Sequence, residues 1–191
     1  MRILWLVALL AGTPLPGRGA ASLEDAGHAG VVTPADSAPA WFRRHLEELT
    51  RGSGRWTADN SAFKSRDEPW DGYGLEWTWG LGRHSVKGRL YAIQDGREVG
   101  SLFEYRLLWH PGERMAMLLQ YGSDGTYGQG VIQPGGTSGT MVEQTFFQPG
   151  GGTTRIKHTE RYVGEVRVVQ SFEWAEGAWH PRRLYRWRRG S

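Results

Sequence analysis

The sequence predicts an all-β protein: an antiparallel up-and-down meander barrel of nine or ten strands, preceded by a short N-terminal helix. Two patterns carry this prediction. After residue 54, apolar and aromatic residues alternate with polar ones over much of the chain, and turn residues recur at intervals of 11 to 16 residues from Asp95 to Glu176. Because side chains alternate across a strand, each alternating row marks one face of a sheet.

The turn signals are mostly Asp-Gly and Pro-Gly pairs. They stand at Asp71-Gly72, Asp95-Gly96, Pro111-Gly112, Asp124-Gly125, Gly135-Gly136, Pro149-Gly150-Gly151, Gly164 and Glu176-Gly177. Their spacing fits strands of about eight to ten residues joined by tight hairpins. No helical stretch separates them, so parallel pairing has no room for its crossovers. A long meander with one apolar face tends to close, because closure removes exposed edges. A two-sheet sandwich is the alternative.

Two segments precede the strands. Residues 22–38 are rich in Ala, Gly, Ser, Asp and Pro and have no period, which predicts a flexible lead-in. A helix of about three turns follows, over Trp41 to Arg51, because Pro39 suits its first turn and Gly52 its end. So short a helix is marginal alone, and its apolar side must pack on the strands. Residues 39–191 are therefore expected to form a single domain.

The first 21 residues resemble a secretory signal peptide. Arg2 supplies a positive start, Ile3 to Leu10 form an apolar run, and Gly19-Ala20-Ala21 offer the small residues that a signal peptidase accepts. The apolar run is too short to span a bilayer core of roughly 30 Å. We therefore expect an exported protein, periplasmic or secreted, whose mature chain begins near Ser22.

Cysteine content and charge exclude several classes of protein. The chain has no cysteine, which excludes disulfides, a lipidated-cysteine anchor and thiolate metal sites. No segment approaches membrane-spanning length, so no stable membrane anchor is expected. Without Arg2 and Arg18 the formal net charge falls from +3 to about +1, which does not favour binding to nucleic acid.

Gly54-Arg55-Trp56, directly after the predicted helix, resembles the Gly-x-Trp start of lipocalins and other calycin barrels. The last predicted strand, Trp179 to Arg189, is rich in arginine. In that superfamily a basic side chain from the closing strand packs over the first-strand tryptophan and seals one end of the barrel. The resemblance implies that Trp56 is this tryptophan and that Arg186 or Arg188 is its partner.

The region Tyr73 to Arg189 also resembles a bacterial family of uncharacterised exported lipocalin-like proteins. The chain lacks the disulfide pair and the C-terminal helix usual in lipocalins. Nitrobindin-like haem barrels have a similar shape and place a haem-ligating histidine near the final strand, where His180 lies. Pro181 follows it directly and the neighbouring residues do not match that pattern, so no haem or other cofactor is expected.

The aromatic rows are the most informative candidates for a binding site. The lumen of a ten-stranded barrel is wide enough to hold a ligand, aromatic rings offer large contact area, and methionine adapts to ligand shape. The residues expected to bind a small hydrophobic ligand are Trp77, Trp79, Phe103, Tyr105, Met117, Tyr121, Phe146, Phe172 and Trp174. Ser101, Gln144 and Gln170 fall in the same rows and would need polar partners inside the barrel.

No catalytic or metal-binding signature is present. The histidines, at 28, 45, 84, 110, 158 and 180, show no metal-ligand spacing and are expected at the surface or the rim. Carboxylates at Glu76, Glu104, Glu143 and Glu173 fall opposite the aromatic rows, where cross-strand salt bridges are expected on the outside. The arginines beside them are Arg89, Arg106, Arg155 and Arg167. The arginines and aromatics of 182–189 alternate between faces, which favours structural packing over nucleic-acid binding.

These observations favour an exported lipocalin-like protein that binds a small, largely apolar molecule without converting it. Two alternatives stay open: a structural or interaction module with a filled core, and a barrel enzyme with a dispersed site, such as an isomerase or cyclase. A contiguous lumen would favour binding over the filled core. An inward His or Glu with a strongly perturbed pKa would favour the enzyme.

Overall fold

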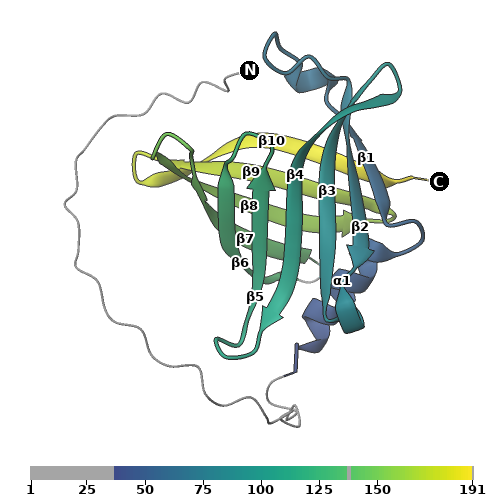
Figure 1. The fold of residues 1–191 in the computed structure, drawn as a ribbon, viewed down its shortest axis with the longest axis vertical. Helices are drawn as coiled ribbons and strands as arrows, with labels where there is room; N and C mark the ends of the chain where they lie inside the picture. Colours follow the sequence, from purple (N-terminus) through teal and green to yellow (C-terminus); the bar gives the residue numbers. More distant parts are fainter. Residues whose placement is uncertain (1–36, 137–138, 191) are drawn as a thin grey trace, which may run out of the picture.

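A computed structural model describes residues 37–136 and 139–190 of the chain. In this part of the chain, ten antiparallel strands follow one another around a closed barrel, and β1 pairs with β10 to complete it (Figure 1). The strands are β1 (Arg55–Asp59), β2 (Gly72–Trp79), β3 (Ser85–Gln94), β4 (Arg97–His110), β5 (Met115–Gly122), β6 (Tyr127–Gly135), β7 (Gly139–Phe147), β8 (Thr153–Val163), β9 (Val166–Ala175) and β10 (Ala178–Arg189).

The predicted fold class is confirmed, and the sandwich alternative is wrong. The helix α1 (Ala40–Thr50) precedes β1, within one residue of the predicted bounds. Single 3₁₀ turns follow β1 (η2, Ser61–Phe63) and β2 (η3, Leu81–Arg83). The predicted signal peptide and nearly all of the predicted lead-in lie outside the described residues. None of the helices within the described residues is long and apolar enough to cross a membrane.

Helix α1 packs at the end of the barrel where β2 turns into β3 and where β8 turns into β9 (Figure 1). Phe42, Leu46 and Leu49 are buried on the side of α1 that joins the barrel core, which includes Leu75 and Val86. The helix therefore covers this end with apolar side chains, as its short length requires.

Trp56 and Gly54 join α1 to the barrel. Trp56 is fully buried, and its indole Nε1 donates to the carbonyl of Leu49 in the last turn of α1, at 3.0 Å. Gly54 has a positive φ of 68°, and a Cβ there would lie 2.2 Å from the carbonyl oxygen of Trp77. Only glycine fits this position, which gives the Gly-x-Trp sequence a steric reason.

The arginine that covers Trp56 is Arg189, and the expectation of Arg186 or Arg188 is wrong. Arg189 is the cross-strand partner of Trp56, and its guanidinium lies 4.2 Å from the centre of the indole ring. It also donates to the carbonyls of Glu48 and Arg51 at the C-terminal end of α1. Side chains alternate along this part of β10, so Arg186 and Arg188 point to the opposite face from Arg189.

An irregularity in β10 determines which residues of this strand face inward. The register with β9 shifts between Pro181 and Leu184. After the shift, Arg183, Tyr185 and Trp187 line the lumen. The arginines and aromatics at the end of the chain are therefore divided between the two faces of the barrel wall, as the sequence predicted.

Candidate functional site: a cavity in the barrel lumen

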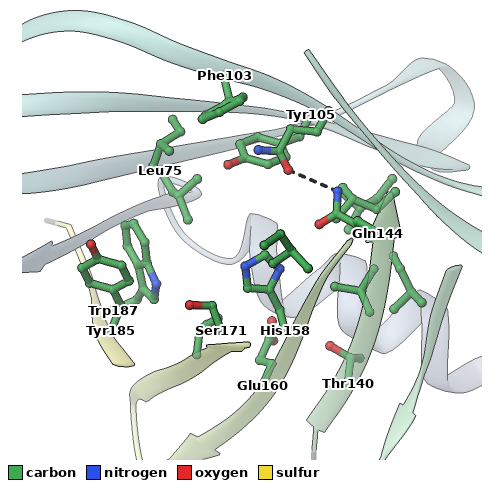
Figure 2. A pocket seen from close by; sticks show the side chains of 18 of the residues that line it. Leu75, Phe103, Tyr105, Thr140, Gln144, His158, Glu160, Ser171, Tyr185 and Trp187 are labelled. Carbon is green, nitrogen blue, oxygen red and sulfur yellow. Dashed lines mark hydrogen bonds between the residues drawn. The ribbon is translucent and has the colours of Figure 1, made fainter. Parts of the chain in front are cut away.

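A cavity of about 410 Å³ lies in the lumen of the barrel. Its wall is mainly apolar, with leucine, isoleucine and aromatic side chains from most of the strands. Figure 2 shows Leu75, Phe103, Tyr105 and Trp187 around this space. A cavity of this volume lies in the usual range of small-molecule sites. The core is therefore not completely filled.

Four of the nine predicted binding residues line the cavity: Trp77, Phe103, Tyr105 and Phe146. Trp77 and Tyr105 lie on neighbouring inward rows, with ring centroids 5.5 Å apart, and the Phe103 ring lies 6.4 Å from Tyr105. These aromatics form a connected wall, as the alternation on β2 and β4 predicted.

Two glycines make room for the large rings. Gly88 is the cross-strand partner of Trp77, and a Cβ at Gly88 would lie 2.3 Å from the Trp77 ring. Gly128 stands opposite Phe146, where a Cβ would lie 2.6 Å from the phenyl ring. A small residue opposite each inward aromatic lets the ring lie across the lumen.

The other five predicted residues do not line the cavity. Trp79 belongs to the inward row of β2 but lies at the α1 end of that strand. There it packs against the core, and the guanidinium of Arg83 lies 4.5 Å from the centre of its ring. Met117 and Tyr121 alternate with Leu118 and Gln120, which do line the cavity. They therefore belong to the outer wall, where Tyr121 is 45% exposed.

The placement of Phe172 and Trp174 inside the barrel is also wrong, because the apolar row of β9 faces outward. Lys157 lies 5.0 Å from the centre of the Phe172 ring, and the guanidinium of Arg155 lies 4.8 Å from that of Trp174. These basic side chains cover the outer aromatics and let them stand on the solvent side. The lining residues of β9 are Arg167, Val169 and Ser171.

A buried ion pair lies at the α1 end of the cavity. The guanidinium of Arg167 donates to Glu160 at 2.7 Å, and each residue is only 9% exposed. Burial opposes ionisation of Glu160, but Arg167 and then His45 outweigh it and hold the pKa of this carboxyl below its usual range. Burial likewise opposes the charge on Arg167, but Glu160 raises the pKa of the guanidinium.

Two histidines stand beside this ion pair. The Nδ1 of His45, on α1, lies 3.7 Å from Glu160, and burial lowers the pKa of His45 in spite of that carboxylate. Burial, with help from Arg167, lowers the pKa of His158 to about 4. Both imidazoles are therefore neutral at neutral pH. The expectation that histidines lie at the surface or the rim is wrong for these two.

His180 is exposed, and one of its ring nitrogens lies 3.1 Å from the carbonyl of Ala175. It does not line the lumen cavity. Among the described residues, no three His, Asp or Glu side chains gather closely enough to hold a metal ion.

Several neutral polar groups complete the lining. Gln144 donates to the side-chain oxygen of Gln120 at 3.2 Å, the bond drawn in Figure 2. Burial raises the pKa of the Tyr105 hydroxyl, which keeps it protonated. Some buried polar atoms of lining residues have no partner within the described residues. These are Nε1 of Trp77, Oε1 of Gln144, Oε1 of Glu160, and Nε and Nη1 of Arg167.

The opposite end of the cavity is bordered by a second ion pair. Arg183 donates to both carboxylate oxygens of Glu68, from the segment between β1 and β2, with one distance of 2.5 Å. Burial opposes ionisation of Glu68, but hydrogen bonds from Arg183 and Tyr73 lower the pKa of its carboxyl. Tyr185 donates to Asn60 at 2.8 Å. The arginine here is 39% exposed at its side chain.

The residues that sequence reasoning missed are the inward charges and histidines: Glu160, Arg167, His158 and His45. A signal was present, because Glu160 and Arg167 carry opposite charges on the two sides of the Gly164 turn. A row is predicted to face inward when its residues are apolar, and this rule always places charged residues on the outer face. Outer salt bridges do form between Glu76 and Arg89 and between Glu143 and Arg155. The expectation that Arg167 lies on the outside with them is wrong, because it faces the lumen and binds Glu160.

No protein-family model matches this chain, and no curated protein matches its sequence.

Proposed function

We propose that this protein is an exported, lipocalin-like carrier that binds a small, largely apolar molecule in the barrel lumen without converting it. One observation carries the proposal: the closed barrel holds a cavity of about 410 Å³ whose wall is mainly apolar. A module with a filled core is not expected to contain such a space, because side chains that border an empty volume lose packing contacts.

The lipocalin-like part of the proposal is supported by the sealed end. Gly54, Trp56 and Arg189 reproduce the arrangement that the Gly-x-Trp resemblance implies, with Arg189 from the closing strand over the first-strand tryptophan. The closed antiparallel meander has the corresponding architecture. The export part rests on the signal-like composition of residues 1–21.

A neutral fluorescent probe, N-phenyl-1-naphthylamine, tests the proposal. We expect it to bind the purified protein with a rise in its emission. Phe103→Ala should enlarge the cavity, change probe affinity at least threefold and cost well below about 3 kcal/mol, because its ring already borders empty space. Phe172→Ala, on the outer wall, is the matched control and should leave probe affinity unchanged.

The opposite result would identify a filled core. In that case the wild type binds no probe, and Phe103→Ala costs about 3 to 5 kcal/mol, as truncation of a fully packed ring does. This outcome would leave the structural or interaction module as the better account.

A barrel enzyme is the second candidate, and the inward cluster of Glu160, Arg167, His45 and His158 favours it. Neutral imidazoles beside a buried ion pair are suited to proton transfer. The two functions differ in the fate of the ligand. A carrier releases its ligand chemically unchanged after long incubation, which mass spectrometry of the extracted small molecule detects, whereas an enzyme releases a product.

A further inference from the structure

The formal charges of the cavity wall are already paired within the protein. Among the described residues that line the cavity, Glu160, Arg167 and Arg183 are the ones that carry a full charge at neutral pH. Arg167 is bound to Glu160 at 2.7 Å, and Arg183 is bound to Glu68. Each formal charge on the cavity wall is therefore compensated by an opposite charge of the protein, and a charged ligand would have to compete with that partner.

The histidines do not supply a charge either. His45 faces Glu160 from α1, and His158 faces the cavity from β8, near Arg167 of β9. Both have lowered pKa values, so both are neutral at neutral pH. A carboxylate or an ammonium group in the lumen would lose its hydration without gaining a counter-ion, which is costly at low dielectric.

The cavity does offer hydrogen bonds. Tyr105 and His158 point into it from β4 and β8 (Figure 2), and neither has a hydrogen-bond partner among the described residues. The protonated Tyr105 hydroxyl can donate, and a neutral imidazole has one donor and one acceptor. The amide nitrogen of Gln120 also lacks an acceptor in this part of the chain, because only its oxygen is used, by Gln144.

A second observation points to a ligand at the same place. Buried polar atoms without a hydrogen-bond partner within the described residues belong to Gln144, at 2% exposure, and to Arg167, at 9%. Buried polar groups are nearly always hydrogen-bonded, so a cluster of unpartnered ones around a cavity indicates a polar group that the cavity receives. The unpartnered atoms include donors, on Trp77 and Arg167, and an acceptor, on Gln144, and a neutral hydroxyl or amide can bond to both kinds.

We propose that the ligand of this cavity is an uncharged amphiphile whose hydroxyl, carbonyl or amide group lies among His158, Tyr105 and Gln120, and that the cavity discriminates against carboxylates and amines. This inference rests on the proposed carrier function and names its ligand class. The apolar part of the ligand lies against the aromatic wall formed by Trp77 and Phe103.

The test uses probes that share one eight-carbon body. 1-Octanol, octanamide, octanoate and octylamine are titrated into the purified protein at pH 7.5, with the intrinsic tryptophan fluorescence as the signal, because Trp77 and Trp187 line the cavity. We expect the alcohol and the amide to bind at least tenfold more tightly than the carboxylate and the amine.

Variants locate the polar group of the probe. Tyr105→Phe keeps the ring and removes one hydroxyl, and His158→Leu removes both imidazole nitrogens; each should weaken octanol binding about three- to tenfold. His158→Gln retains a donor and an acceptor and should restore part of the loss. The matched controls are Tyr121→Phe on the outer wall and His84→Leu in an exposed turn, which should bind octanol as the wild type does.

The outcomes separate the two claims. If octanoate or octylamine binds as tightly as octanol, or if Tyr105→Phe and His158→Leu bind octanol like the controls, the neutral-ligand inference is overturned while the carrier function stands. If none of the four probes binds, both the carrier function and the inference fail. Circular dichroism of each variant distinguishes a loss of binding from a loss of folding. If His158→Leu does not fold, the octanol affinity of Tyr105→Phe alone decides the inference, because phenylalanine fits this site without strain.

Discussion

Each end of the barrel carries an arginine-containing ion pair and aromatic rings, but the two ends bury charge to different depths. At the α1 end, Arg167 and Glu160 are both 9% exposed beneath the helix, close to the stack of Arg189 on Trp56. At the other end, the side chain of Arg183 is 39% exposed where it meets Glu68. The same kind of ion pair thus stands in two different solvent environments.

This difference separates a structural seal from an accessible rim. Removing one partner of a buried ion pair leaves an uncompensated charge, which is strongly destabilising, whereas exposed pairs contribute little. We therefore expect mutations at the α1 end to unfold the protein and mutations at the opposite end to act mainly on the passage of ligand.

The largest effect is expected at Trp56. Trp56→Ala removes a fully buried ring, the hydrogen bond to Leu49 and the surface on which Arg189 lies, so the free energy of unfolding should fall by roughly 3 to 5 kcal/mol. Trp174→Ala, on the outer wall and 37% exposed, is the control and should cost less than about 1 kcal/mol. Urea denaturation measures both, and similar losses in the two variants would show that Trp56 does not seal the barrel.

A somewhat smaller loss is expected from the buried ion pair. Arg167→Met leaves Glu160 without its partner and should cost about 3 kcal/mol. The double variant Glu160→Gln/Arg167→Met removes both charges and should recover part of that stability. If the double variant is less stable by the sum of the two single losses, the two charges act independently and the ion pair has no coupling energy.

The pH dependence of stability should come mainly from His158. Its folded-state pKa of about 4 lies below the ordinary value of 6.5, so the neutral imidazole stabilises the fold fully above pH 6.5. This stability is lost as the pH falls from 6.5 towards 4, by roughly 3 kcal/mol at about 1.4 kcal/mol per pKa unit. The lowered pKa values of His45 and of the Glu160 carboxyl change stability in the same direction, because both groups also lose stabilising interactions as the pH falls. In His158→Leu, the urea concentration at the unfolding midpoint should change little between pH 6.5 and 4. If it falls as it does in the wild type, another group causes the pH dependence.

The smallest effect is expected at the opposite end. Arg183→Met breaks a partly exposed ion pair with Glu68 and should cost at most about 1 kcal/mol. Because Arg183 lines the cavity at this end, we expect its removal to change the rate at which a probe enters more than it changes stability. Stopped-flow fluorescence measures that rate. A stability loss as large as that of Arg167→Met would erase the contrast between the two ends.

The strand count, the helix and the aromatic wall of β2 and β4 followed from the sequence, because period-two alternation and Asp-Gly turns are local signals. The partner of Trp56 did not, because it depends on the register of β10, which shifts between Pro181 and Leu184. One residue of register exchanges the two faces of a strand, so Arg189 could not be told from Arg188 without the pairing.

The inward face of β9 was missed for a different reason. Apolar residues were assigned to the interior, yet Phe172 and Trp174 stand outside under Lys157 and Arg155, while Arg167 lies inside with Glu160. The charged pair lies on two strands joined by the Gly164 turn, and its members compensate each other only once that hairpin forms. Hydrophobic periodicity alone therefore cannot predict that two opposite charges will lie together inside the barrel.

The most direct test of a ligand-binding lumen is a crystal structure of the protein grown with 8-bromo-1-octanol, in which anomalous scattering locates the bromine. We predict one bromine peak inside the barrel, against the aromatic wall near Trp77 and Phe103, with the hydroxyl within hydrogen-bond distance of His158 or Tyr105. A lumen without bromine, or bromine only on the outer wall beside Trp174 and Trp179, would contradict it.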